Sequence, residues 1–320
     1  MSHLRLSGLI PATVTPMNDR YEVVEDDLRS YMSWITRYKI GGLAINVDTG
    51  EGPTLTREER KRIISVVASV VKGRVPIIAG VPPASTLDAT RTATDARDAG
   101  AEGLLVFPNP AFFGKPLPPE PPYQYHRAIG EGSGLSIVLF QLQPDLGGYD
   151  LSEEVLFKLI QIPEVVAIKE ASFDARKYSN LIRMLERAPR KITLLTGNDN
   201  FIAESLIIGG EGALIGFGTL ATQEQIEICE KIRKGQYSDA LEIWNRILPL
   251  EEVIFGLPVR DYRARTKIAL ALQGVIENVQ VRPPLLPISR GEIEKVRTAL
   301  KTAEIPLERS VEAVHRVRRS

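Results

Sequence analysis

The chain has 320 residues, and its 40 basic side chains balance its 40 acidic ones, so the formal net charge is zero. A neutral chain gives no general electrostatic reason to expect nucleic acid or an anionic membrane as a partner. The single cysteine, Cys229, excludes an internal disulfide, which is typical of a reducing compartment. The sequence also has no long apolar segment, so we expect a cytoplasmic protein. The three histidines, His3, His126 and His315, lie far apart, so we expect no metal site.

Short apolar runs alternate with longer segments of helical period along the first two thirds of the chain. The apolar runs predict strands over residues 9–13, 42–46, 76–80, 103–107, 136–140, 165–169, 192–196 and 212–215. The helical segments between them cover residues 26–38, 56–71, 86–99, 123–131, 152–160, 176–187 and 201–208. Thr56 and Glu59 form a capping box, which marks the start of the second helix.

Strands that alternate with helices pair in parallel, and eight such units match the (β/α)8 TIM barrel. We expect the barrel over residues 1–222, its last helix to about residue 235, and a C-terminal helical region over residues 236–305. Residues 306–320 are expected to form a frayed basic tail. A proline-rich excursion over residues 108–122 is too long for a minimal turn, and such loops usually cover a site or serve an interface.

One predicted strand ends in a lysine. Residues 165–168 are apolar and are followed directly by Lys169 and a polar turn. Burial would lower the pKa of this amine, and the neutral amine can attack a carbonyl carbon. The alternative is a lysine that ends the strand and reaches water, because most lysines are exposed.

In such barrels the chemistry lies at the C-terminal ends of the strands. Besides Lys169, these ends fall at residues 13–15, 48–51, 140–141, 198–199 and 216–218. Asp48, Thr49 and Gly50 combine free backbone amides with a threonine hydroxyl, and together these groups could hold a carboxylate. An ordinary structural turn would use the same residue types, so both interpretations stay open.

Several short motifs follow one another along the chain. They are Pro11 to Pro16, Thr49-Gly50-Glu51 with Leu55-Thr56 and Glu58-Glu59, Val75 to Gly80, Ala99-Gly100-Ala101, Val166 to Ser172, Thr196 to Asp199, and Gly209 to Ala213. Together these motifs resemble the dihydrodipicolinate synthase and N-acetylneuraminate lyase family, and they occur in the family's order and at compatible spacings from about residue 9 to residue 300.

The resemblance implies a barrel with a helical C-terminal region, usually a homotetramer, and class I aldolase chemistry without a metal or organic cofactor. Lys169 matches the lysine that forms an imine with pyruvate or another 2-oxo acid. Thr49, with the amides around Gly50, matches the motif that holds the carboxylate of this acid, and Gly216 lies where the family's backbone completes the pocket. We therefore expect a small 2-oxo acid as substrate and a homo-oligomer.

Several positions depart from the family pattern. Counting back from Lys169 without a gap places Gln141 where the family has the tyrosine that relays protons, and a shift by one gives Phe140. The tyrosine that a partner subunit contributes in the synthases is most nearly matched by Phe113, and their substrate-binding arginine by Leu146. Dihydrodipicolinate synthesis itself is therefore not expected.

Asp48 replaces the first threonine of the family's Thr-Thr-Gly-Glu motif and is our candidate general acid or base, the alternative being a carboxylate that caps local amides. Gln141 could orient substrate or water through its amide. The sequence thus predicts an aldolase or dehydratase that acts on pyruvate or a 2-keto-3-deoxy acid through an imine on Lys169. A degenerate barrel that binds 2-oxo acids without turnover is one alternative, and a true dihydrodipicolinate synthase is another.

A further motif allows a different interpretation. Residues 216–221 formally fit the Gly-x-Gly-x-x-Ala dinucleotide fingerprint, between a predicted strand and a predicted helix. No following strand with an acidic residue completes the binding unit, which argues against a dinucleotide. A phosphate site near the eighth strand, and hence a phosphorylated substrate, stays an open alternative.

Overall fold

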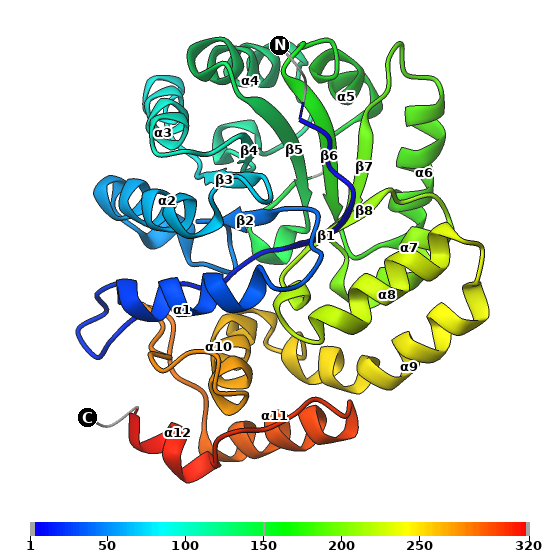
Figure 1. The fold of residues 1–320 in the computed structure, drawn as a ribbon. Coiled ribbons are helices and arrows are strands. Elements are labelled where there is room, and N and C mark those ends of the chain that lie inside the picture. The colour runs from blue at the N-terminus through cyan, green and yellow to red at the C-terminus, as the bar shows by residue number, and fades with distance from the viewer. Residues whose placement is uncertain (1–3, 150, 318–320) are drawn as a thin grey trace.

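The computed structural model describes residues 4–149 and 151–317, in which eight parallel strands form a barrel surrounded by helices (Figure 1). The strands follow one another in the order β1-β8-β7-β6-β5-β4-β3-β2. The barrel closes between β1 and β2, because Ala12 pairs with Ala44 and the Thr13 amide donates to the Ala44 carbonyl at 3.1 Å. The strands are β1 (Gly8–Pro11), β2 (Leu43–Ile45), β3 (Ile77–Val81), β4 (Gly103–Val106), β5 (Ser136–Leu142), β6 (Val165–Ala171), β7 (Thr193–Thr196) and β8 (Gly212–Ile215).

One α-helix follows each strand and packs on the outside of the barrel (Figure 1). These helices are α1 (Glu25–Ile35), α2 (Arg57–Val71), α3 (Thr86–Asp98), α4 (Glu120–Ser133), α5 (Glu153–Leu159), α6 (Ala175–Glu186), α7 (Ile202–Ile207) and α8 (Thr222–Arg233). The predicted (β/α)8 barrel is confirmed. The capping box of α2 is present as predicted, with Thr56 accepting from the Glu59 amide and Glu59 accepting from the Thr56 amide.

Helix α4 begins three residues earlier than the sequence pattern predicts, at Glu120 rather than Tyr123. Pro121 and Pro122 occupy its first turn. The predicted helix excluded them because a proline inside a helix usually breaks it. In the first turn, however, a backbone amide has no partner inside the helix, so a missing N–H disrupts no hydrogen bond.

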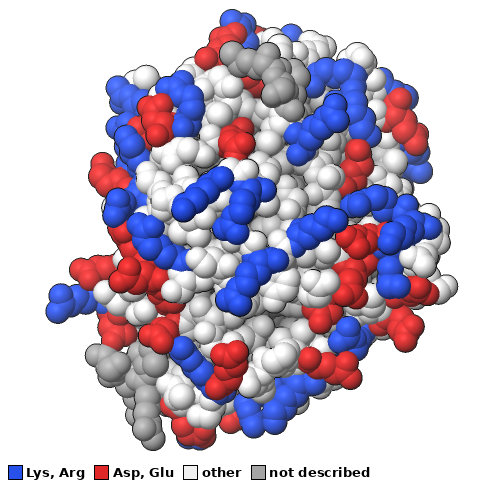
Figure 2. Space-filling model, in the orientation of Figure 1, with Lys and Arg blue, Asp and Glu red and all other residues white. Residues whose placement is uncertain are grey.

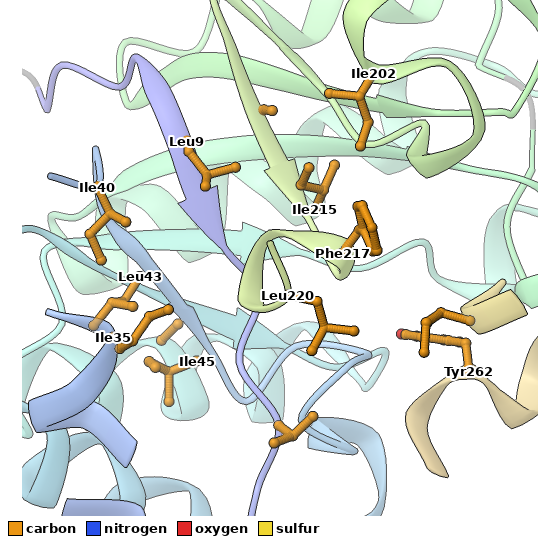
Figure 3. Close-up of a cluster of buried hydrophobic side chains, with 14 of the residues drawn as sticks. Leu9, Ile35, Ile40, Leu43, Ile45, Ile202, Ile215, Phe217, Leu220 and Tyr262 are labelled. Carbon is orange, nitrogen blue, oxygen red and sulfur yellow. The ribbon is translucent and has the colours of Figure 1, made fainter. Parts of the chain in front are cut away.

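Alternating strand residues divide the buried side chains into two cores. Each strand contributes at least one apolar side chain to the barrel interior: Ile10, Ala44, Ile78, Leu105, Val138, Ala167, Leu195 and Leu214. The neighbouring residues point outward and pack under the helices, where Leu43 and Ile45 lie beside Ile35 of α1 (Figure 3). This alternation decides which side chains of β5 and β6 can reach the barrel's interior.

Beyond α8, the chain is helical, as the sequence predicts. The additional helices are α9 (Tyr237–Ile254), α10 (Tyr262–Leu272), α11 (Arg290–Thr302) and α12 (Val311–Val317). Helix α12 lies in the segment expected to be a frayed tail, and its Val311 and Val314 side chains are buried. The prediction of a frayed tail relied on the basic composition of this segment and did not consider these two apolar residues. Their spacing of three residues places them on one face of a helix. Residues 318–320 of the predicted tail lie outside the described residues.

The surface carries both signs of charge. On the face drawn in Figure 2, basic and acidic side chains are interspersed. Among the helices of residues 4–149 and 151–317, none is long and apolar enough to cross a membrane.

Candidate active site

Lys169 projects into the barrel near the C-terminal end of β6. Its register partner on β5 is Phe140, and the Lys169 Nζ lies 4.3 Å from the centre of the Phe140 ring. The lysine is only 8% exposed. This burial lowers its pKa to about 8, although the negative charges of Asp199 and Asp48 act in the opposite direction. A substantial fraction of the amine is therefore neutral near pH 8 and able to act as a nucleophile.

Gly197, just after β7, leaves the space that the lysine stem occupies. A Cβ atom at this position would lie 2.5 Å from Lys169 Cε and 2.8 Å from the Ala171 Cβ. Atoms without a bond between them do not approach this closely, so only glycine allows the present path of the stem.

Lys169 opens into a pocket with about 390 Å³ of empty space, its mouth included. The polar side chains that line it are Asp48, Thr49, Lys169, Asp199 and Tyr262. Among the described lining residues, Lys169 is the only lysine or arginine. Much of the remaining lining is apolar and includes Phe140, Leu142, Leu146 and Phe173. The pocket therefore combines one amine and a few polar groups with an apolar wall.

The turn after β2 brings Thr49 into this pocket, and the loop after β8 brings Gly216 beside it. A Cβ atom on Gly216 would lie 3.1 Å from Thr49 Oγ1, so the two residues are close neighbours. Gly50 lies behind Thr49, where a Cβ would lie 2.8 Å from the Thr13 carbonyl, and the Gly50 carbonyl accepts from the Thr15 hydroxyl at 2.8 Å. The structure thus gathers Thr49 and Gly216 around the pocket of Lys169, with Gly50 supporting the turn.

Asp48 has partners that the sequence did not predict. Both of its carboxylate oxygens lie 2.5 Å from a nitrogen of the Arg263 guanidinium, and the Tyr262 hydroxyl donates to Oδ2 at 2.7 Å. The Arg263 Nε also donates to the Asp48 carbonyl at 2.9 Å. Asp48 is therefore the centre of an ion-paired network with α10.

Gln141 does not occupy the position predicted for it. Val138, Phe140 and Leu142 point into the barrel, so Gln141 points outward, where it lines a separate hollow with Leu156 and Leu181. Phe140 is the residue that faces Lys169. The gap-free count from Lys169 was wrong by one residue, and a one-residue slip in a strand moves a side chain to the opposite face.

Asp199, which follows the end of β7, and Glu251 of α9 are two buried carboxyl groups for which no role was predicted. Burial raises the pKa of Asp199 to about 7 and that of Glu251 to about 9. Asp199 Oδ1 accepts from the Phe217 amide at 2.9 Å, and its charge further raises the pKa of Glu251. Two carboxyl groups that share a buried region thus stand beside the pocket, and Asp199 lines it directly.

The loop over residues 216–221, which fits the dinucleotide fingerprint, is packed tightly against the barrel. Phe217, Gly218 and Thr219 are buried, and a Cβ on Gly218 would lie 3.1 Å from the Pro11 Cα of β1. This close approach packs the loop directly against β1 and leaves no space for a pyrophosphate. The glycine pattern therefore has a structural explanation.

The profile of the dihydrodipicolinate synthetase family matches residues 5–303. The chain belongs to this family. A 4-hydroxy-tetrahydrodipicolinate synthase of Neisseria meningitidis serogroup C, strain 053442, is 30% identical over 299 residues, which make up 93% of this chain and 99% of that protein. Family membership makes the chain a lyase of the class I aldolase type.

Solved structures of the family share the fold over nearly the whole chain. A monomeric dihydrodipicolinate synthase variant has a TM-score of 0.86 at 26% identity, covering 94% of this chain and 98% of that one. The chloride-inhibited dihydrodipicolinate synthase of Acinetobacter baumannii, in complex with pyruvate, has a TM-score of 0.83 at 29% identity and covers 94% of this chain and all of that one (100%).

Proposed function

We propose that this lyase forms an imine between Lys169 and the C2 carbonyl of pyruvate or a 2-keto-3-deoxy acid. The observation that carries the proposal is the buried Lys169 amine, which lines a pocket and whose pKa is lowered to about 8, so that more of it is neutral than in an ordinary lysine. The related Acinetobacter baumannii enzyme was crystallised with pyruvate, which supports a 2-oxo acid as the ligand class.

A protonated imine withdraws electrons from the neighbouring carbon. It stabilises the carbanion that forms there, and so permits carbon–carbon cleavage, condensation or the loss of a 3-hydroxyl as water. The apolar part of the pocket lining, which includes Phe140, Leu142 and Phe173, would lie beside this intermediate.

In this proposal the carboxylate of the 2-oxo acid lies between Thr49 and Gly216. Thr49 lines the pocket, and Gly216 brings its backbone close to it without a side chain. Backbone amides are suitable donors for a carboxylate, and the Thr49 hydroxyl, which lies 3.3 Å from the Tyr262 hydroxyl, borders the carboxylate without donating to it. Gly50 holds the turn that presents Thr49.

The second substrate, or the released fragment, is proposed to lack a carboxylate. Leu146 lines the pocket at the position that the resemblance matches to the substrate-binding arginine, and Leu142 and Phe173 extend this apolar wall. A carboxylate beside these side chains would lose its hydration without gaining a charged partner. An aldehyde with an uncharged chain fits this wall better than aspartate semialdehyde does.

Phe140 supports a second candidate, a barrel that binds 2-oxo acids without turnover. A phenylalanine facing Lys169 cannot exchange protons, and proton exchange is required for the enamine chemistry. A sensor of this kind would form the imine and release the 2-oxo acid unchanged.

We also propose that the chain assembles into a homo-oligomer through the proline-rich segment over residues 108–122. Phe113 in this segment is 48% exposed, although its ring contacts Tyr149 with centroids 5.4 Å apart. Large exposed aromatic side chains are typical of interfaces. Light scattering should give a dimer or tetramer mass for the wild type, and a lower mass for Phe113→Glu.

The test of the activity uses two panels of compounds. Pyruvate is offered with uncharged aldehydes and with aspartate semialdehyde, and separately a series of 2-keto-3-deoxy acids is offered alone. We expect carbon–carbon or carbon–oxygen lyase turnover that fails in Lys169→Ala and that prefers the uncharged aldehydes. Binding without product across both panels would favour the sensor, and preferred turnover of aspartate semialdehyde would show a true synthase.

A further inference from the structure

Two hydroxyl groups and a carboxylate form a hydrogen-bonded line along the pocket. The Tyr262 hydroxyl lies 2.7 Å from Asp48 Oδ2 and 3.3 Å from Thr49 Oγ1. A phenol carries one proton and a carboxylate only accepts, so the Tyr262 proton points to Asp48. The Thr49 hydroxyl then donates to Tyr262. The line therefore has a direction, from Thr49 through Tyr262 to Asp48.

The helix that carries Tyr262 is fixed to the barrel. Tyr262 is the first residue of α10, and its side chain projects from that helix (Figure 3). The ring stacks on Phe255 with centroids 4.8 Å apart and an interplanar angle of 18°. Further along α10, Lys267 forms an ion pair with Glu51 at 2.6 Å, and both side chains are completely buried. These contacts hold the Tyr262 hydroxyl in one place relative to the turn after β2.

We propose that Tyr262 is a proton-relay residue and that, together with Thr49 and Asp48, it performs the proton transfer for which β5 supplies no tyrosine. This inference rests on the proposed imine at Lys169. Phe140 occupies the inward position of β5 opposite that lysine, so the relay enters the pocket from α10.

The relay acts when the imine becomes an enamine. The C3–H bond of the bound 2-oxo acid breaks, its electron pair forms the C2–C3 double bond, and the nitrogen regains its lone pair. The Thr49 oxygen takes the C3 proton while its own proton passes to Tyr262 and the Tyr262 proton passes to Asp48. Asp48 ends as a neutral acid, and the reverse transfer returns a proton to C3.

The enamine step is the one that needs this relay. An ammonium group and a ketone give a protonated imine and one water molecule with no net uptake or release of protons. Conversion of the protonated imine to the enamine, in contrast, releases one proton, and a positioned acceptor must take it. Before the transfer, the Arg263 guanidinium balances the charge of Asp48.

Asp199 is the other carboxyl group that lines the pocket, and it is the rival acceptor. Its Oδ1 is engaged by the Phe217 amide at 2.9 Å, on the side of the loop after β8. The charge of Asp199 acts on Lys169, so its removal should alter imine formation more than proton transfer from C3.

The test measures imine formation and C3 proton transfer separately. Pyruvate and borohydride, followed by intact mass, report the imine. Pyruvate in D₂O, followed by the loss of its methyl signal in proton NMR, reports the transfer and needs no second substrate. The variants are Tyr262→Phe, Asp48→Asn and Asp199→Asn. Tyr125→Phe is the matched control, because it removes the hydroxyl of another buried tyrosine, on α4.

We expect the wild type and Tyr125→Phe to form the adduct and to exchange their methyl protons. Tyr262→Phe should keep the adduct but lose exchange by a factor of about 10² to 10⁴, and Asp48→Asn should show the same separation. Full exchange in Tyr262→Phe with exchange lost in Asp199→Asn would assign the transfer to Asp199 and overturn the relay. Loss of the adduct in Tyr262→Phe would show that this residue only positions the site. No adduct in the wild type would refute the proposed function itself.

Discussion

Replacing Gly197 with alanine tests whether the position of the Lys169 amine controls the chemistry. The new Cβ would lie 2.5 Å from Lys169 Cε and 3.0 Å from its Cγ. Because ordinary carbon contacts are about 3.5–4.0 Å, the lysine stem would have to move by about 1 Å. A displacement of about 1 Å at a reacting group lowers rates by a factor of about 10².

The assay is the rate at which borohydride traps pyruvate on the variant. Gly197→Ala should form the adduct about 10² times more slowly than the wild type and should unfold at slightly lower temperature, since overpacking costs about 1–3 kcal/mol. Gly291→Ala is the control, because a Cβ there meets no atom closer than 3.9 Å. Trapping at the wild-type rate in a folded Gly197→Ala protein would refute the reasoning, since it would show that the amine tolerates displacement.

Three further predictions follow from the buried ionisable groups. Because burial lowers the Lys169 pKa to about 8, the pyruvate trapping rate should rise with pH to a midpoint near 8, and a rate still rising above pH 10 would contradict this. Lys267→Met leaves Glu51 as an unpaired buried charge and should lower the free energy of unfolding by about 3–5 kcal/mol in urea titrations, whereas Arg290→Ala, which breaks an exposed pair, should change it by less than about 1 kcal/mol. The Glu251 pKa is raised from an ordinary value of 4.5 to about 9, so between these pH values the folded state keeps a proton that the unfolded state releases. The free energy of unfolding therefore falls as the pH rises from 4.5 to about 9. Glu251→Gln should therefore gain about 4 kcal/mol relative to the wild type between pH 5 and pH 8, and a pH-independent difference would show that Glu251 is ionised in the folded protein.

The barrel and its lysine could be predicted because each depends on local sequence pattern. Alternation of apolar runs with helical periods gives the eight βα units, and a buried run that ends at Lys169 gives the position of the amine. The choice between Phe140 and Gln141 depends on a register of one residue, which a count along the sequence does not fix.

The partners of Asp48 could not be predicted, because no local pattern links them to it. Tyr262 and Arg263 are 214 and 215 residues away in sequence, and α10 brings them to the turn after β2 only when the C-terminal helices pack on the barrel. A tyrosine and an arginine at the start of a helix are unremarkable in sequence. The raised pKa values of Asp199 and Glu251 likewise depend on tertiary burial.

The most direct test of the central claim is intact mass after incubation with pyruvate and borohydride, run beside Lys169→Ala. The expected result is one pyruvyl adduct on the wild type and none on the variant, which would place the imine on Lys169. An adduct of equal yield on both proteins, or none on the wild type while a known family member reacts under the same conditions, would contradict the proposed chemistry.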